Sequence, residues 1–141
     1  MPQQPDVGRG LLRTVVGAAI VRDGRVLTGR RRTPADLAGR WEFPGGKVEP
    51  GESESAAVAR ECREELGISV AVAGQLGRAV ISEDIELVLY AATLTKGQPT
   101  SGATHDLLRW LTMAELRTVQ WVEPDKMLLN AVEQHVSRPQ A

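Results

Sequence analysis

The feature that most constrains this chain is the stretch from Gly45 to Ile68, where a glycine-containing loop leads into a segment with helical periodicity. Glu61, Glu64 and Glu65 are spaced i, i+3, i+4, so a helix places them on one face, within an arc of about 100°. The spacing predicts a helix that presents these carboxylates along the border of its buried side. The apolar stripe that would be buried is Ser55, Val58, Ala59, Cys62 and Leu66.

Such a helix brings like charges together, and Glu61 and Glu65 at i, i+4 cost about 0.2–0.5 kcal/mol. Arg60 offsets part of the repulsion by leaning toward Glu64, but it cannot neutralise all three carboxylates. A hard divalent cation such as Mg²⁺ could neutralise all three, since it binds carboxylate oxygens and keeps coordination positions open for water and substrate phosphate. The alternative is a solvated polar face on an amphipathic helix, which is the commoner origin of such a run.

The loop before the helix completes a longer pattern. Gly45 and Gly46 permit positive φ angles and let the backbone approach a ligand closely. Gly46 is followed by five residues, Glu52, seven residues, and then the run from Arg60 to Ile68, RECREELGI. This resembles the Nudix box of the Nudix hydrolases at every position, with Cys62 in an apolar slot that more often holds an aliphatic residue. The upstream WEFP sequence, residues 41–44, narrows the resemblance to the MutT-like branch.

Composition limits the class of protein and its partners. The chain has 141 residues and a net charge of −1, which indicates one ordinary domain without a basic field for a nucleic-acid polymer. Cys62 is the only cysteine, so no intrachain disulfide can form, which fits a reducing cytoplasm. No apolar run is long enough to span a bilayer. We expect a cytoplasmic monomer or homodimer with no membrane partner.

Turn and cap signals predict the order of the elements. Residues 1–10 are expected to form a flexible tail, residues 11–136 a single domain, and residues 137–141 a second tail. Asp23-Gly24 predicts a hairpin, and Gly67 predicts the end of the helix that starts near Ser53. Thr112 and Glu115 predict the capping box of a short helix to about Val119. We expect strands at 11–22, 25–31, 41–43, 68–72, 77–81, 85–95 and 107–111, and a last helix at 124–136.

Strands around a central helix, with another helix at the end, predict an α/β sandwich. The resemblance implies the same Nudix fold, an α/β/α sandwich with a mixed β-sheet between helices. It also implies the reaction: hydrolysis of a nucleoside diphosphate linked to another group. From a nucleoside triphosphate substrate, the products would be the monophosphate and pyrophosphate. The implied cofactor is Mg²⁺, or Mn²⁺ in its place.

By resemblance, the metal ligands are Glu61, Glu64, Glu65 and the backbone carbonyl of Gly45. Arg60 joins the three glutamates in the expected catalytic set, because its ion pairs would orient their carboxylates. One of these glutamates, or one just outside the box, would be the general base, and the sequence leaves that choice open. Glu52 is expected to be structural, at the junction of loop and helix.

One departure from the family pattern affects the number of metal ions. Relatives often carry an acidic metal ligand before the penultimate strand, where this chain has Thr104. Asp106 is a candidate substitute. His105 is expected to be a loop histidine, since Mg²⁺ prefers oxygen ligands.

Substrate contacts are expected from a basic run and from acidic residues near the loop. Arg30 and Arg31 end a strand and could hold phosphate through planar bidentate donors, or could simply be a solvated strand end. Glu42 either faces the substrate or is an exposed strand residue, and Lys47 is read as an exposed loop lysine. Trp110 and Trp121 are expected to pack in the core.

Asp125 falls where MutT-like relatives place a base-reading residue. Relatives that act on oxidised guanine tend to have Asn there, and relatives that act on cytidine nucleotides tend to have Asp. A carboxylate accepts from the exocyclic amine of cytosine, although it would also accept from guanine donors. The alternative is an acidic residue favoured by the helix dipole. The expected substrate-binding residues are Arg30, Arg31, Glu42, Gly45 and Asp125.

These features favour a MutT-like nucleoside triphosphate pyrophosphohydrolase that clears the nucleotide pool and so protects DNA, as in DNA repair. Asp125 favours cytidine or 5-methylcytidine nucleotides slightly over 8-oxo-dGTP. The first alternative is a Nudix hydrolase of ADP-ribose or a nucleotide sugar. The second is a non-catalytic ligand-sensing module on the same fold, although such modules typically lose glutamates of the box.

Overall fold

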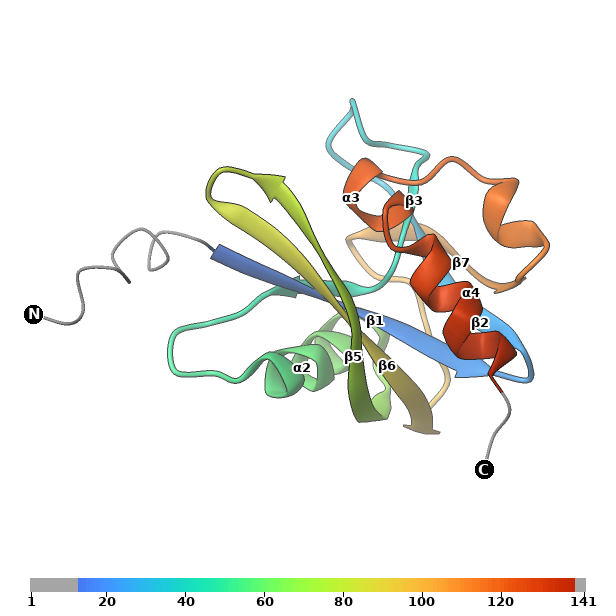
Figure 1. The fold of residues 1–141 in the computed structure, drawn as a ribbon, viewed down its shortest axis with the longest axis horizontal. Helices are drawn as coiled ribbons and strands as arrows, with labels where there is room; N and C mark the ends of the chain where they lie inside the picture. The colour runs from blue at the N-terminus through green and yellow to red at the C-terminus, as the bar shows by residue number, and fades with distance from the viewer. Residues whose placement is uncertain (1–12, 139–141) are drawn as a thin grey trace, which may run out of the picture.

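The computed structural model describes residues 13–138, in which a mixed β-sheet lies between helices (Figure 1). The tail expected at residues 1–10 lies outside the described residues. Ser137 belongs to the last helix and not to the expected C-terminal tail, of which residues 139–141 lie outside the described residues. The elements are β1 (Arg13–Arg22), β2 (Arg25–Arg31), β3 (Trp41–Glu42), β4 (Gly45–Lys47), α2 (Glu54–Leu66), β5 (Ser69–Ser82), β6 (Ile85–Lys96), β7 (His105–Thr112), the 3₁₀ helix η1 (Glu115–Arg117), α3 (Glu123–Lys126) and α4 (Leu129–Ser137).

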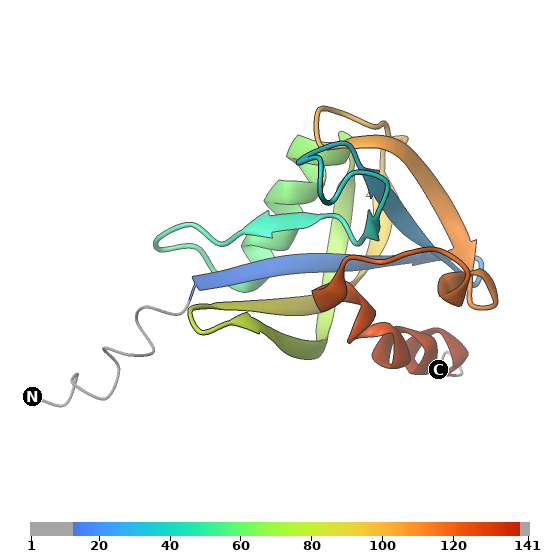
Figure 2. The ribbon, with the colours of Figure 1, turned by 90° about the horizontal axis from the view of Figure 1, so that it is seen from above.

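The sheet has the strand order β3-β2-β1-β6-β5, while β4 pairs with β1 and β7 pairs with β2. β1 and β6 are parallel, and the other pairs are antiparallel. Figure 2 shows α2 on one side of the long strands and α4 on the other. Each side has its own hydrophobic cluster, one built on Val58, Cys62 and Leu66 of α2 and one on Leu129 and Val132 of α4. The expected α/β/α sandwich with a mixed sheet is confirmed.

Local signals placed the first hairpin and the long helix correctly. Asp23 and Gly24 both have positive φ, 54° and 74°, as a two-residue turn between β1 and β2 requires. The Ser53 side chain accepts a hydrogen bond from the Ala56 amide, and Gly67 ends α2 in the left-handed conformation, with φ 70°. On α2 the buried stripe includes Ala57 and not the predicted Ser55, which is exposed.

Three predictions about elements were wrong. Gly45–Lys47 was expected to be loop and forms β4, because its glycines let it pair closely with β1. The strands expected at 68–72 and 77–81 are one strand, β5, whose register shifts at Val72/Gln75 and Gln75/Gly77 keep it paired with β6. The last helix is broken between α3 and α4, where Leu128 leaves helical geometry and its side chain lies over Gly77.

The capping box forms as predicted, but the helix after it is short. The Glu115 amide donates to the Thr112 hydroxyl, and the Glu115 carboxylate accepts from the Thr112 amide, 2.9 Å away. The indole of Trp121 donates to the Leu116 carbonyl at 2.6 Å, and the Thr118 hydroxyl donates to the backbone carbonyl of Glu115. These side-chain bonds take carbonyls that a longer helix would use, so η1 ends at Arg117.

Candidate active site

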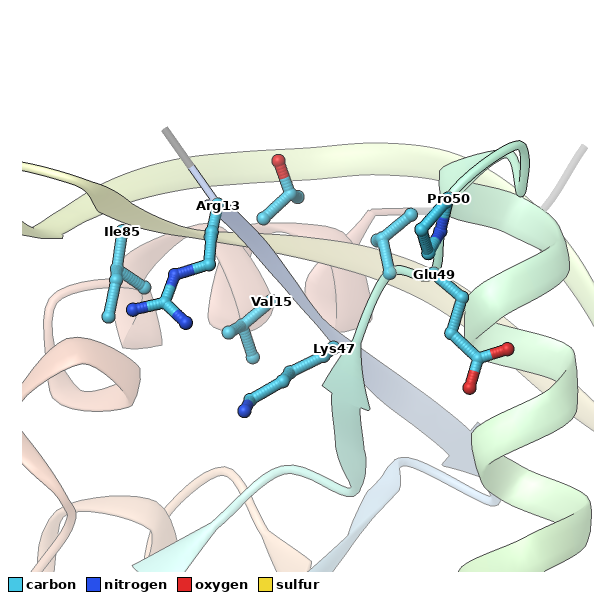
Figure 3. Close-up of a pocket in the computed structure, with 8 residues that line it drawn as sticks. Arg13, Val15, Lys47, Glu49, Pro50 and Ile85 are labelled. Atoms are coloured by element: carbon cyan, nitrogen blue, oxygen red, sulfur yellow. The ribbon is translucent and has the colours of Figure 1, made fainter. Parts of the chain in front are cut away.

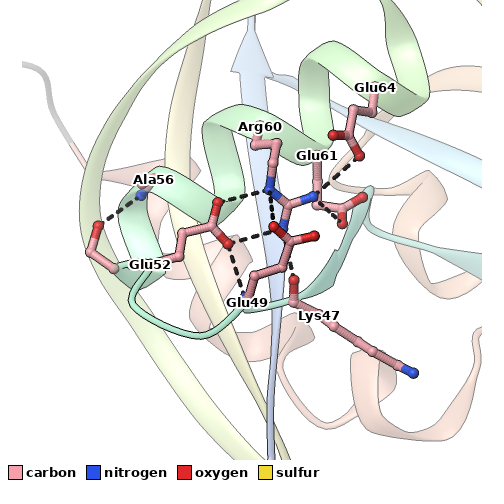
Figure 4. Close-up of polar contacts among 8 residues, drawn as sticks. Lys47, Glu49, Glu52, Ala56, Arg60, Glu61 and Glu64 are labelled. Carbon is pink, nitrogen blue, oxygen red and sulfur yellow. Dashed lines mark hydrogen bonds and ion pairs between the residues drawn. The ribbon is translucent and has the colours of Figure 1, made fainter.

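Arg60 is the centre of a charged cluster between α2 and the loop before it (Figure 4). Its guanidinium donates to both carboxylate oxygens of Glu52, at 2.7 and 3.0 Å, and to Glu61 and Glu64 at 3.1 and 3.2 Å. It also donates to the backbone carbonyl of Lys47 at 2.9 Å. The Arg60 hydrogen bond lowers the pKa of Glu52 to about 2. Arg60 therefore links the glycine-containing loop to the helix, and it orients the carboxylates of Glu61 and Glu64 toward its guanidinium.

The three glutamates predicted as metal ligands lie in different environments. The Glu64 side chain is 60% exposed, and that of Glu61 is 14% exposed. Glu65 is more enclosed, and its carboxylate accepts a hydrogen bond from the Gly45 amide at 3.1 Å. Burial raises the pKa of Glu61, and burial raises the pKa of Glu65 to about 7. The fold thus holds two desolvated carboxylates beside the Gly45–Gly46 backbone, a costly arrangement without a cation.

The two glycines of β4 are needed for different reasons. A Cβ on Gly45 would lie 1.9 Å from the Val16 carbonyl oxygen, so a side chain there would break the pairing with β1. A Cβ on Gly46 would lie 2.4 Å from the carboxyl group of Glu61. Gly45 therefore lets the strand pair, and Gly46 leaves the space that the Glu61 carboxylate occupies.

The donor chemistry of this cluster fits a hard divalent cation. Carboxylates of α2 and the carbonyl of Gly45 are oxygen ligands of the kind that Mg²⁺ prefers. Across residues 13–138, no three acidic, histidine or cysteine side chains are already grouped as a metal site. Glu61 is turned to Arg60 and Glu65 to the Gly45 amide, so binding an ion requires these side chains to turn.

The basic run at the end of β2 is held in ion pairs. Arg31 Nη1 lies 3.0 Å from each carboxylate oxygen of Glu42. Arg30 donates to both oxygens of Asp106, at 2.8 and 3.2 Å, and this lowers the pKa of Asp106. Asp106, the candidate substitute for an acidic metal ligand, is therefore paired with an arginine in the structure. Arg30 is part-exposed and remains next to solvent, whereas Arg31 is joined to the proposed substrate contact Glu42.

His105 is not the loop histidine that we expected. It is fully buried as the first residue of β7, and its Nε2 atom lies 2.9 Å from a carboxylate oxygen of Glu42. Its ring occupies the space above Gly29, where a Cβ would lie 2.6 Å from the imidazole. The contact joins residues far apart in the chain, so local sequence could not predict it. A glycine inside an otherwise regular strand was the one available signal of a close approach.

Asp125 lies in a pocket next to the short strand β3. Its side chain is buried and accepts a hydrogen bond from the Phe43 amide at 2.8 Å, and burial raises its pKa to about 8. This hydrogen bond fastens α3 to the WEFP segment. The pocket has a volume of about 530 Å³ and an apolar wall with a few polar groups, as ligand sites usually have. Its lining includes Val15, Leu37, Arg40, Glu42, Ile81 and Asp125.

A second groove, of about 570 Å³, adjoins the first through Val15 (Figure 3). The side chains of Arg13 and Lys47 extend into it from β1 and β4. Lys47 is exposed, as expected for its position. The two grooves follow one face of β1, and the Arg60 cluster begins where the loop leaves β4.

Of the two tryptophans predicted to pack in the core, Trp121 does so, and Trp110 does so only in part. Trp121 is 3% exposed and packs against Phe43, with ring centroids 4.8 Å apart. Trp110 is partly buried against the α2-side cluster, and the guanidinium of Arg22 lies 4.3 Å from its ring centroid. In the described part of the chain no helix has the length and apolar character needed to cross a membrane.

Comparison with known proteins agrees with this geometry. The NUDIX domain family matches residues 11–137. The chain is 46% identical over 116 residues to the putative 8-oxo-dGTP diphosphatase 2 of Mycobacterium tuberculosis, covering 79% of this chain and 82% of the relative. It is 57% identical over 58 residues to the CTP pyrophosphohydrolase of Escherichia coli, covering 41% of this chain and 43% of that protein. The solved structure of the E. coli ORF135 protein is 34% identical and superposes with a TM-score of 0.76, covering 92% of this chain and 95% of the other. This chain belongs to the Nudix family and is a MutT-like Nudix pyrophosphohydrolase.

Proposed function

We propose that this enzyme hydrolyses (deoxy)nucleoside triphosphates to the monophosphate and pyrophosphate with Mg²⁺, and that it clears unwanted nucleotides from the cytoplasmic pool. The observation that carries the proposal is the juxtaposition of two desolvated glutamates, Glu61 and Glu65, with the Gly45–Gly46 backbone. Two partly buried carboxylates beside a backbone carbonyl suit a divalent cation and a polyanionic substrate. We propose that it acts as a monomer or homodimer.

In this proposal Glu61, Glu64, Glu65 and the Gly45 carbonyl would hold the ion. When bound, Mg²⁺ would neutralise phosphate charge and favour attack by water. Arg60 would keep the carboxylates oriented, since it already bonds Glu61 and Glu64. One carboxylate of this cluster would accept the proton of the attacking water.

We propose the pocket around Asp125 as the nucleobase site, with Glu42 at its edge, Arg40 in its lining, and Arg30 and Arg31 as further substrate contacts. An Asp125 carboxyl with a pKa near 8 keeps its proton at neutral pH. It can then both donate and accept, which matches the N3 acceptor and the N4 amine of cytosine. This supports a slight preference for cytidine or 5-methylcytidine nucleotides, and the likeness to a CTP pyrophosphohydrolase agrees with it.

The second candidate substrate is 8-oxo-dGTP. A relative that matches 79% of this chain is described as a putative 8-oxo-dGTP diphosphatase. Without its proton, Asp125 would only accept, which suits the N1–H and N2 amine of a guanine edge. The two candidates therefore differ in the protonation state that they require of one side chain.

A substrate panel tests the proposal. Pyrophosphate release would be measured with CTP, dCTP, 5-methyl-dCTP, 8-oxo-dGTP and dGTP, and AMP release with ADP-ribose, each with and without Mg²⁺. We expect Mg²⁺-dependent release from the cytidine nucleotides at the highest kcat/KM. The absence of release from every triphosphate would reject the function. Faster hydrolysis of 8-oxo-dGTP would keep the reaction and reverse the proposed preference.

A further inference from the structure

The buried imidazole of His105 belongs to a chain of contacts that ends at the proposed substrate site. Its Nε2 atom lies 2.9 Å from Glu42 Oε2, and Arg31 Nη1 lies 3.0 Å from both Glu42 oxygens. An ionised carboxylate can only accept, so the proton in the His105–Glu42 contact is on Nε2. Nδ1 has no hydrogen-bond partner among the residues that the structure describes. The Glu42 contact is therefore the hydrogen bond that the structure gives this ring.

The backbone is shaped to hold the ring in this place. The pairing of β2 with β7 shifts register between Arg30 and Arg31, where Asp106 is skipped and His105 faces Arg31. Asp106 thus lies outside, bonded to Arg30, while the His105 side chain is fully buried. Gly29 leaves the space that the ring occupies, since a Cβ there would meet three imidazole atoms at 2.6–2.8 Å. The bulge and Gly29 both make room for His105, and packing of the strands alone would require neither.

Glu42 connects this buried contact to the ligand pocket. It lines the same pocket as Asp125, and its side chain is 16% exposed. Its partner Arg31 also donates to the Thr33 carbonyl at 2.9 Å, which fixes the arginine. Glu42 is therefore held from one side by Arg31 and from the protein interior by His105, with its remaining surface toward the pocket.

We infer that His105 is a positioning residue for substrate recognition: with Arg31 it fixes the Glu42 carboxylate at the wall of the nucleobase pocket, and Gly29 makes room for it. The inference rests on the proposed function of that pocket. Loss of the imidazole donor would free Glu42 to turn. A hydrogen bond to a charged group is worth enough to change affinity by about tenfold or more. The loss should therefore raise KM and blur the discrimination between bases, with a smaller change in kcat.

The test compares His105→Leu, which removes the donor, with His105→Gln, whose amide nitrogen can replace Nε2–H. The matched control is His135→Gln, on α4 and outside this network. We expect His105→Leu to raise KM for the preferred nucleotide about tenfold or more, while His105→Gln recovers most of that loss and the control changes nothing. KM values that stay at the wild-type level in His105→Leu, or that rise equally in both His105 variants, would overturn the inference.

A crystal structure of His105→Leu supplies a readout that needs no turnover. We expect the Glu42 carboxylate to leave its position at the pocket wall while β2 and β7 stay paired. An unchanged Glu42 would overturn the inference even if the enzyme is active on nucleotides. Should His105→Leu fail to fold, Gly29→Ala gives the same test, because its Cβ displaces the ring while the histidine is retained. Inactivity of the wild-type enzyme on the whole panel would instead reject the proposed function, so the two failures are distinct.

Discussion

Glu65 carries a charge that its surroundings disfavour. Burial raises its pKa to about 7, and in the absence of an ion its nearest donor is the Gly45 amide. We expect Glu65→Gln to lower kcat by orders of magnitude, because an amide neither binds Mg²⁺ as strongly nor accepts a proton from water. Pyrophosphate release at saturating substrate measures the effect.

The fold should survive this substitution, since glutamine can still accept from the Gly45 amide. Circular dichroism and the melting temperature should stay close to those of the wild type. Glu133→Gln is the matched control, because Glu133 pairs with Arg117 on the surface, far along the chain from the box. An unchanged rate in Glu65→Gln would contradict the assigned site.

Asp125 should make stability depend on pH. Its folded pKa, about 8, is raised above the ordinary value of 3.8, so its contribution to folding is fully present below about pH 4 and is lost as the pH rises toward 8. The slope from one such group approaches about 1.4 kcal/mol per pH unit. Asp125→Asn removes this titration, and we expect the free energy of unfolding of the variant to vary less between pH 4 and pH 8.

Urea unfolding without divalent metal, at several pH values, checks this expectation. A second variant, Asp125→Ala, tests base reading, because alanine can neither donate nor accept, and it should lower the ratio of kcat/KM for CTP to that for 8-oxo-dGTP. If the free energies of unfolding of Asp125→Asn and of the wild type varied with pH in the same way, Asp125 would be ionised in the folded enzyme. An unchanged substrate ratio would remove Asp125 as the reader of the base.

Some residues of the site could be predicted from the sequence, and others could not. The carboxylates of the box and Arg60 could be named because their spacing on a helix is local. The burial of His105 and the bond from Phe43 to Asp125 could not, since each depends on segments that lie more than 60 residues apart. Arg30 and Arg31 were predicted to contact phosphate or to form a solvated strand end, and the fold pairs both with carboxylates, which local sequence did not indicate.

Elements were predictable where a short signal decides them. Ser53, Gly67 and the Asp23-Gly24 turn each act over a few residues, and α2 and the first hairpin lie where they indicate. The errors lie where tertiary pairing overrides local preference. β4 exists because β1 is beside it, β5 is continuous because β6 pairs along it, and Leu128 interrupts the last helix to fill the core.

The two glycines of β4 should respond differently to alanine. Gly45→Ala puts a methyl group against the backbone of Val16, which cannot give way, so we expect a clear loss of stability. Gly46→Ala meets the end of the Glu61 side chain, which can rotate away, so we expect a small change in melting temperature with a large fall in kcat. Gly74→Ala, on β5, is the control, because its Cβ would meet nothing within 4 Å.

Melting curves and kinetics of the three alanine variants separate these effects. If Gly46→Ala kept wild-type kcat, the position of the Glu61 carboxylate would not matter to the reaction. If Gly45→Ala had the same melting temperature as the control Gly74→Ala, the close pairing of β4 with β1 would contribute little to stability.

At the scale of the whole molecule, each face of the sheet supports a different part of the proposed site. The α2 side packs Val58, Cys62 and Leu66 against the strands and thereby fixes where the glutamates emerge. The α4 side packs around Trp121 and Leu129 and carries α3, which brings Asp125 to the WEFP segment. The proposed catalytic carboxylates and the proposed base pocket thus depend on different hydrophobic clusters, which meet along β1.

This arrangement predicts that Mg²⁺ stabilises the entire fold. An ion that binds only the folded chain adds RT ln(1 + [Mg²⁺]/Kd), about 2.7 kcal/mol at a hundred times Kd. Its effect should exceed simple screening, because Glu61 and Glu65 are desolvated carboxylates that the bound ion would pair. We expect the melting temperature to rise by several degrees in Mg²⁺ and to return when EDTA is added. NaCl at equal ionic strength controls for screening, and Glu65→Gln should lose most of the rise. Equal shifts in NaCl and MgCl₂, or a full shift in Glu65→Gln, would mean that the glutamate cluster is not where the ion binds.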